Sequence, residues 1–395
     1  MPWKETCDMD ERLKFVAECE TSLESMTQIC ARYQVSRKTG YKWLARWQSS
    51  RNLAERSRAP HQVGWAISPA QAALIVELRR RWPSFGPCKL KAKLAELYPE
   101  QSWPVPSTIG DLLRREGLSE RRPRQRRTAA TSPGPLLVAL YPNQLWAIDY
   151  KGSFCTGDGQ RCDPLTITDS YSRFLLCCAI IAPTIEQTQL QMERVFKEYG
   201  LPNVIRSDNG SPFASIGAGG LTALSVWWLK LGIGLERIEK GHPEQNGRHE
   251  RLHRTLKQQT VRPPAATCQA QQRRFDHFRH HYNYERPHEA LGQVAPGTIY
   301  TASARPYPSQ LPEPSYAARY SVRRVRSNGE IKWGGGLVFI SEALRGEVVG
   351  MIETASGKWL ARFINHNLGI IEPRTNKLRP VLPGETLDFD EDADE

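Results

Sequence analysis

The chain has 395 residues, a formal net charge of +12 at pH 7 and a hydrophobic content of 39%. This length exceeds what one ordinary hydrophobic core encloses, so we expect roughly two to four domains. The positive charge favours nucleic acid as the partner, because phosphate attracts clustered lysine and arginine. No apolar run approaches the roughly 18 residues of a membrane span, and no signal-peptide pattern opens the sequence. We therefore expect a cytoplasmic, nucleoid-associated protein without membrane contact.

The first residues predict a helix-turn-helix domain, residues 1–56. Helical patterns cover residues 10–22 and 26–48, and Ser36 stands as an N-cap within the second stretch. The helix that starts there opens with polar and basic residues: Arg37, Lys38, Thr39 and Lys42. The second helix of such a motif enters the major groove, so these four side chains are candidate DNA contacts. A three-helix unit packed for other reasons is the alternative.

The same pattern recurs and predicts a second helix-turn-helix domain, residues 66–118. Ser68-Pro69 opens the first expected helix, and the third carries Ser107 and Thr108 at the N-cap position and closes at Gly117. A basic linker, residues 119–140, follows with five arginines between residues 121 and 127. It is either a solvated linker or a tether that lies along a phosphate backbone.

The remaining chain predicts two further domains and a tail. Three strands in a meander, followed by alternating helices and strands, indicate an α/β domain with a mixed sheet over residues 141–295. Short strands separated by glycine turns predict a small, β-rich C-terminal barrel over residues 315–383. Residues 384–395 form an acidic tail that we expect to be disordered.

Three acids of the central region are candidate metal ligands, although each also has an ordinary explanation. Asp149 stands in an apolar strand, where an unpaired buried carboxylate is costly. Asp208 lies in an Asp-Asn-Gly sequence that is also typical of a turn. Glu250 lies among cations, where a helical salt bridge to Arg254 is the alternative. Together the three fit phosphoryl transfer on two metal ions, whose oxygen ligands favour Mg²⁺ or Mn²⁺.

Four ordered motifs carry a resemblance to a known family. They are WAIDYKG, IRSDNGSPF, HPEQNGRHERLHRTLK and HYNYERPHEALGQVAPGTIY, within residues 146–300. They resemble the catalytic core of the retroviral-integrase superfamily, in the branch of DDE transposases from bacterial insertion sequences. The resemblance implies an RNase H-like fold and a catalytic, metal-binding triad of Asp149, Asp208 and Glu250 holding two Mg²⁺ or Mn²⁺ ions. It also implies that Arg254 and Lys257 contact the DNA terminus.

One interval departs from the family pattern. Forty-one residues separate Asp208 from Glu250, more than the superfamily's familiar spacing, and we assign the surplus to residues 214–220. Asp169 matches a recurrent family position, and we interpret it as a structural acid in a turn between strands. The histidine-rich residues 277–288 match no zinc-ligand spacing, so we interpret them as a helix end.

The predicted function is a DNA transposase. Helix-turn-helix domains would recognise the terminal inverted repeats of the element. The catalytic core would cleave the phosphodiester with metal-activated water and join the freed 3′-OH to target double-stranded DNA. Joining two ends in concert implies a homo-oligomer on DNA. A DNA-binding regulator with a degenerate integrase core and a nuclease of RNA–DNA hybrids are the alternatives.

Overall fold

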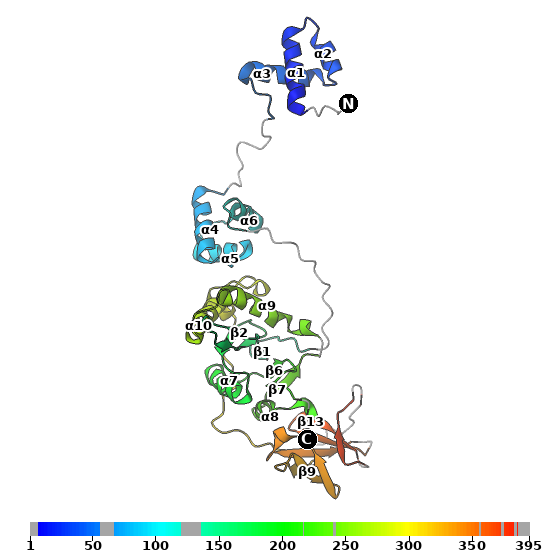
Figure 1. Ribbon diagram of the computed structural model, residues 1–395. Coiled ribbons are helices and arrows are strands. Elements are labelled where there is room, and N and C mark those ends of the chain that lie inside the picture. The colour runs from blue at the N-terminus through cyan, green and yellow to red at the C-terminus, as the bar shows by residue number, and fades with distance from the viewer. Residues whose placement is uncertain are drawn as a thin grey trace. The chain divides into compact units, whose positions relative to one another are not determined.

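The computed structural model describes the chain in segments, with the helices and strands named as in Figure 1. The described residues are 7–55, 67–119, 136–215, 217–239, 242–354, 357–372, 375–382 and 385. The arginines between 121 and 127 and most of the predicted acidic tail lie outside them. No helix among these residues is long and apolar enough to cross a membrane. The chain divides into two compact units, residues 1–66 and 67–395, which we describe separately.

The first unit contains three helices that enclose a small core. They are α1 (Asp8–Thr21), α2 (Met26–Arg32) and α3 (Arg37–Ser50). The Ser36 hydroxyl accepts a hydrogen bond from the Thr39 N–H, which confirms the predicted cap. Gly40 lets α3 approach α1 and α2 closely, because a Cβ there would lie 2.5 Å from the Cys30 sulfur. The predicted helix, turn and second helix are therefore present, and α3 is the candidate recognition helix.

The second unit begins with another three-helix group. Its helices are α4 (Pro69–Arg81), α5 (Pro87–Leu97) and α6 (Pro106–Arg115). Ser68 caps α4 as expected, but α6 starts earlier than expected: Val105 is its N-cap and Pro106 is its first residue. Proline suits a first helical position, because its fixed φ and missing N–H cost nothing there. This placement makes Ser107 and Thr108 helical residues rather than caps.

A mixed five-stranded sheet forms the centre of the second unit. Its strands are β1 (Leu145–Tyr150), β4 (Pro164–Asp169), β5 (Leu175–Ile180), β6 (Val204–Ser207) and β7 (Gly234–Arg237), in the order β5-β4-β1-β6-β7. Strand β1 pairs antiparallel with β4 and parallel with β6, which pairs parallel with β7. A short hairpin of β2 (Phe154–Cys155) and β3 (Arg161–Cys162) interrupts the meander between β1 and β4.

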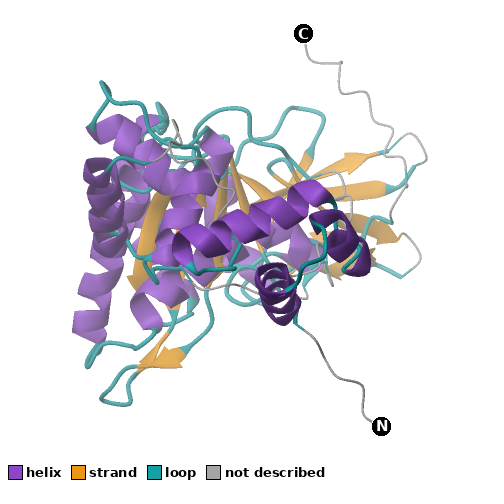
Figure 2. Ribbon diagram, turned by 90° about the horizontal axis from the view of Figure 1, so that it is seen from above, coloured by secondary structure: helices purple, strands orange, loops and turns teal. Residues whose placement is uncertain are grey.

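Helices cover both faces of this sheet, whose strands are orange among purple helices in Figure 2. Helices α7 (Ile185–Tyr199) and α8 (Ala223–Lys230) share a core with Trp146 and Ile148 of β1. Helices α9 (Gly247–Leu256) and α10 (Cys268–Tyr284) pack against β5 in a separate cluster. Successive strand residues point to opposite faces, so Asp149 lies on the face opposite Ile148. This alternation directs Asp149 away from the α7 and α8 core.

The C-terminal strands form two sheets. One has five strands: β8 (Ser321–Arg324), β11 (Val348–Glu353), β12 (Trp359–Phe363), β13 (His366–Glu372) and β14 (Lys377–Arg379). The other is the hairpin of β9 (Glu330–Trp333) and β10 (Gly336–Phe339). Strand pairing within the described residues does not close a barrel, so the β-rich character is as expected and the predicted barrel is not observed.

The surplus residues before Glu250 pack against this C-terminal region. The short 3-10 turn η1 (Ala218–Gly220) contacts β13, and the Gly219 carbonyl lies 3.1 Å from His366 Nε2. Val226 and Leu229 of α8 share a core cluster with the C-terminal strands. The longer interval between Asp208 and Glu250 therefore supports an interface between the central sheet and the C-terminal domain.

Candidate active site

Two of the three predicted acids lie at the carboxyl ends of adjacent parallel strands. Asp149 is near the end of β1, and Asp208 directly follows β6. The two strands pair with Leu145 opposite Val204 and Ala147 opposite Arg206, and continuing this register by two residues sets Asp149 beside Asp208. Parallel strands therefore bring together two acids that lie far apart in the sequence.

The third acid comes from α9. A 3-10 turn, η2 (Pro243–Asn246), leads into this helix, and Glu250 lies in its first turn with an exposed side chain. Helix α9 ends at Leu256, and Lys257 begins a π-helical turn, η3 (Lys257–Val261). Arg254 and Lys257 are both exposed. No ion pair within the described part of the chain joins Glu250 to Arg254, so the simple helical salt bridge does not account for Glu250.

Burial and the negative charges of Asp208 and Glu250 all raise the pKa of the Asp149 carboxyl group. Burial is the main cause that raises its pKa, from 3.8 to about 7, and the charge of Asp208 is the second. The charge of Glu250 raises the pKa further, while the Tyr150 backbone hydrogen bond lowers it. Three carboxylates within electrostatic range repel one another, and a divalent cation relieves that repulsion. The acids therefore fit oxygen-ligated metal binding.

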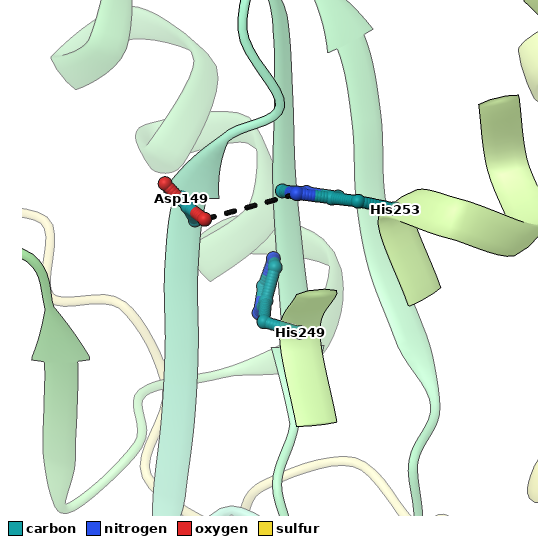
Figure 3. A group of neighbouring side chains, drawn as sticks. All are labelled: Asp149, His249 and His253. Carbon is teal, nitrogen blue, oxygen red and sulfur yellow. Dashed lines mark ion pairs between the residues drawn. The ribbon is translucent and has the colours of Figure 1, made fainter. Parts of the chain in front are cut away.

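Two histidines that the sequence motifs did not single out lie beside Asp149. His249 is buried and His253 half-buried on the side of α9 that faces the sheet, and both rings lie near Asp149 (Figure 3). The ligand atoms of these three residues all lie within 4.8 Å of one another. Among the described residues, these three side chains lie close enough together to share one metal ion, and the three acids do not.

Burial keeps both histidines neutral at neutral pH. It lowers the pKa of His253 to about 4, with a smaller effect from Lys151, and lowers the pKa of His249 well below 6.5. The 3.8 Å contact between His253 Nδ1 and Asp149 Oδ2 is therefore not a salt bridge near pH 7. The sequence does contain a pattern that points to this pair, because two histidines four residues apart lie on the same face of a helix.

A basic cleft of about 1160 Å³ lies beside the outer face of α9. Six cationic side chains line it: Lys89, Arg173, Arg248, Arg251, Arg254 and Arg286. Glu289 is the single acid in the lining. Burial and the charge of Arg286 lower the pKa of Lys89 to about 8. Burial and the charge of Arg248 lower the pKa of Arg173 to about 10. Cations crowded in this way without matching acids form a site for a polyanion.

The second three-helix group contributes Ser84 and Lys89 to the lining of this cleft. Arg286 donates a 3.1 Å hydrogen bond to the Ser84 hydroxyl, and Lys89 donates to the Pro287 carbonyl. The Phe85 ring stacks on His281 with centroids 5.6 Å apart. Residues 277–288 therefore pack against the preceding helices, which agrees with their interpretation as a helix end rather than a zinc site.

Two other groups of predicted residues occupy distinct places. The candidate DNA contacts of the first unit lie in the opening turns of α3, where Arg37, Lys38 and Lys42 are exposed and Thr39 is partly exposed. Asp169 is buried at the end of β4 and accepts hydrogen bonds from the Asn143 N–H and from the N–H and hydroxyl of Ser172. These contacts match its interpretation as a structural acid.

Sequence comparisons agree with the fold of the first three-helix unit and of the central domain. Residues 140–243 and 231–296 match the integrase core domain family, and residues 8–54 match a homeodomain-like domain. A 31.7 kDa uncharacterised protein of insertion element IS407 from Burkholderia multivorans is 28% identical over 228 residues, 57% of this chain and 78% of the relative. A 39.2 kDa uncharacterised protein of insertion element IS476 from Xanthomonas euvesicatoria is 27% identical over 251 residues, 62% of this chain and 69% of the relative.

Solved structures show weaker similarity. The catalytic core domain of HTLV-2 integrase in complex with magnesium is 14% identical, with a TM-score of 0.34. The match covers 42% of this chain and 100% of the HTLV-2 chain. A chain of the simian T-cell lymphotropic virus intasome, solved in complex with a PP2A regulatory subunit, is 15% identical, with a TM-score of 0.36. The match covers 78% of this chain and 99% of the intasome chain.

Residues 140–296, which contain the central sheet and its covering helices, match an integrase core domain, which implies a polynucleotidyl transferase that uses divalent metal ions. The integrase-core matches and the two relatives support a bacterial insertion-sequence transposase of the retroviral-integrase superfamily. Its homeodomain-like domain and integrase core imply DNA as the partner.

Proposed function

We propose that the protein cleaves DNA at the ends of an insertion element and joins the freed 3′-OH to target DNA. The observation that carries this proposal is the position of Asp149 and Asp208 at adjacent strand ends, with Glu250 in electrostatic range. Hydrolysis of one strand would free the hydroxyl, whose oxygen would then attack a target phosphodiester in line and expel the target 3′ oxygen. Neither step needs a covalent bond to the protein.

The donor set fits two Mg²⁺ or Mn²⁺ ions held by Asp149, Asp208 and Glu250. When bound, such ions activate the attacking oxygen and neutralise charge on the scissile phosphate. The protein itself would orient the ligands and hold the DNA. The Asn246 amide, 3.5 Å from Asp149 Oδ2, limits how that carboxylate rotates. Arg254 and Lys257 would bind phosphates next to the cleaved bond.

The exposed basic residues define where the DNA would lie. Arg37, Lys38, Thr39 and Lys42 on α3 would contact the terminal inverted repeats in the major groove. The cleft along α9 would hold the phosphate backbone that leads to the cut site. Since two ends must be joined together, the active form would be a homo-oligomer assembled on DNA.

A cleavage and strand-transfer assay with Asp149→Asn, Asp208→Asn and Glu250→Gln tests this proposal. The substrate is a labelled duplex carrying the inverted repeats that flank the gene, incubated with Mg²⁺ or Mn²⁺. We expect each variant to lose about a hundredfold to a thousandfold of both activities, because metal ligation supplies several kcal/mol to the transition state. Binding of the repeat DNA should stay close to wild type.

Asp276→Asn is the matched control, since this acid is exposed on α10, where it accepts a hydrogen bond from Gln272. It should keep full activity. Cleavage that survives in all three triad variants would overturn the proposal. Binding without any cleavage by the wild-type protein would favour a DNA-binding regulator instead.

A further inference from the structure

Helix α9 carries two histidines close to Glu250 that have no part in the proposed carboxylate triad. His249 and His253 are separated by four positions, within the sequence His-Glu-Arg-Leu-His. On a helix, this H-E-x-x-H arrangement places two imidazoles on one face, where they are able to ligate one metal ion. The face here points at β1 and β4, and Figure 3 shows the His253 ring extending from α9 towards Asp149.

A hydrogen bond from the Thr166 hydroxyl to the Asp149 carbonyl assigns the protons of the two neighbouring histidine rings. Thr166 lies opposite Asp149 in the β1–β4 pairing, and its hydroxyl donates to the Asp149 carbonyl over 3.1 Å. The same oxygen lies 2.6 Å from His249 Nε2 and 2.7 Å from His253 Nε2. A hydroxyl has one proton, so with that proton on the carbonyl both histidines must donate from Nε2. His253 Nδ1 then has a free lone pair.

That lone pair faces the carboxylate. His253 Nδ1 lies 3.8 Å from Asp149 Oδ2, beyond the length of a hydrogen bond. Once Asp149 is deprotonated, its carboxylate oxygen and this lone pair repel each other unless a cation lies between them. Zinc-class ions bind nitrogen at about 2.0–2.1 Å and carboxylate oxygen at about 2.0–2.2 Å. The two bond lengths together exceed 3.8 Å, so one ion with a bent nitrogen–metal–oxygen angle reaches both atoms.

The surrounding contacts also resemble those of a metal-ligating histidine. Such a ligand usually donates its second ring N–H to a protein oxygen, which fixes the tautomer and the ring orientation. Thr166 provides that oxygen for His253. Thr166 also contacts His249, whose Nδ1 lies 3.4 Å from the Thr168 hydroxyl. His249 thus has a partner for each ring nitrogen, and it acts as a positioning residue for the hydroxyl that orients His253.

We propose that His253 Nδ1 and Asp149 Oδ2 ligate the same divalent ion, which gives this centre a preference for Mn²⁺, Co²⁺ or Zn²⁺ over Mg²⁺. An imidazole nitrogen suits transition metals, whereas Mg²⁺ takes oxygen ligands. The inference rests on the proposed function only in making Asp149 a metal ligand. It adds a nitrogen ligand from the helix that carries Glu250.

Titration of the full chain with Co²⁺, without DNA, tests this assignment. Visible absorption reports the ligand set of bound Co²⁺, and a competing titration measures Zn²⁺. We expect His253→Ala and His253→Gln to weaken Co²⁺ and Zn²⁺ binding by about tenfold or more and to lose the absorption of a nitrogen ligand. Mg²⁺ binding, measured by calorimetry, should change less than twofold. Asp149→Ala should lose the bound Co²⁺ altogether.

His280→Ala is the matched control, because this histidine is exposed on α10. All of these variants keep the nine cysteines of the chain, so a difference between their spectra does not come from the loss of a thiol ligand. Circular dichroism checks folding, and His253→Gln decides the outcome if His253→Ala unfolds. Wild-type Co²⁺ spectra and affinities in both His253 variants, or in Asp149→Ala, would overturn the assignment. Failed DNA cleavage with a clear His253 effect would instead contradict only the proposed function.

Discussion

The two faces of α9 serve different purposes, although they alternate along one stretch of ten residues. The inner face contributes Leu252 and Leu256 to a core with β5 and α10, and it directs His249 and His253 towards the sheet. The outer face exposes Glu250, Arg251 and Arg254. The inner face therefore determines where the helix lies, and the outer face presents charged side chains to solvent. This division predicts that substitutions on the two faces have separable effects.

Removing an inner-face side chain should have the largest effect on stability. Leu252 is 4% exposed, so Leu252→Ala should lower the free energy of unfolding by about 2–4 kcal/mol, the cost of lost burial plus a cavity. Chemical denaturation measures this loss. The outer-face control Arg254→Ala should change the free energy by about 0.5 kcal/mol or less. Similar losses in both variants would show that the faces are not distinct.

The contact between the inner face and Asp149 should give an unusual pH dependence. The folded protein keeps the Asp149 proton up to about pH 7, so the contribution of this carboxyl to stability falls as pH rises from about 4 to 7. The pKa of His253, about 4, has the opposite effect: its contribution is lost as pH falls from about 6.5 to 4. The two trends oppose each other in the wild-type protein.

Asp149→Asn removes one of these trends. On acidification from pH 7 to pH 5 without divalent metal, the variant should lose on the order of 2 kcal/mol more stability than wild type, since it lacks the stabilising protonation of Asp149. Urea unfolding at several pH values measures the difference. Asp276→Asn should follow the wild-type curve. Identical curves for Asp149→Asn and wild type would mean that the pKa of Asp149 is not raised by the fold.

Reversing a charge on the outer face should have the smallest effect, and it should affect DNA binding alone. Arg251→Glu should weaken binding of duplex DNA by about tenfold and lower the slope of log affinity against log salt by about 1–2, because fewer counterions are released. Fluorescence anisotropy at several salt concentrations measures both. Lys197→Glu, an exposed change on α7 outside the cleft lining, should leave the slope unchanged.

Local patterns along the chain predicted most of the secondary structure. The caps at Ser36 and Ser68 follow from side chains that accept hydrogen bonds from backbone N–H groups three residues on, so they depend only on near neighbours. The predictions of the first helix-turn-helix domain and of the integrase core are confirmed by the family matches, and the second helix-turn-helix domain, residues 66–118, stays a prediction. The assignment of the triad and of the individual DNA contacts stays a prediction, which the proposed assays test.

The structure departs from the sequence-based expectations where segments far apart in the chain meet. Helix α9 ends at Leu256 and the chain continues as a π-helical turn, in which Thr260 and Val261 are buried. The spacing of polar residues does not reveal such a change, because packing against α10 selects it. The expected barrel is a five-stranded sheet and a hairpin, since strand pairing depends on partners that local sequence does not specify.

For this protein, the sequence by itself determined the elements, the order of the motifs and the three acids, because periodicity and turn chemistry are properties of short segments. Only the tertiary structure decided what surrounds those acids. Register between β1 and β6 sets Asp149 beside Asp208, and the packing of α9 turns His249 and His253 towards Asp149. Contacts with residues 84–89 form the basic cleft. Each of these depends on burial and pairing between segments far apart in the chain, which local patterns do not encode.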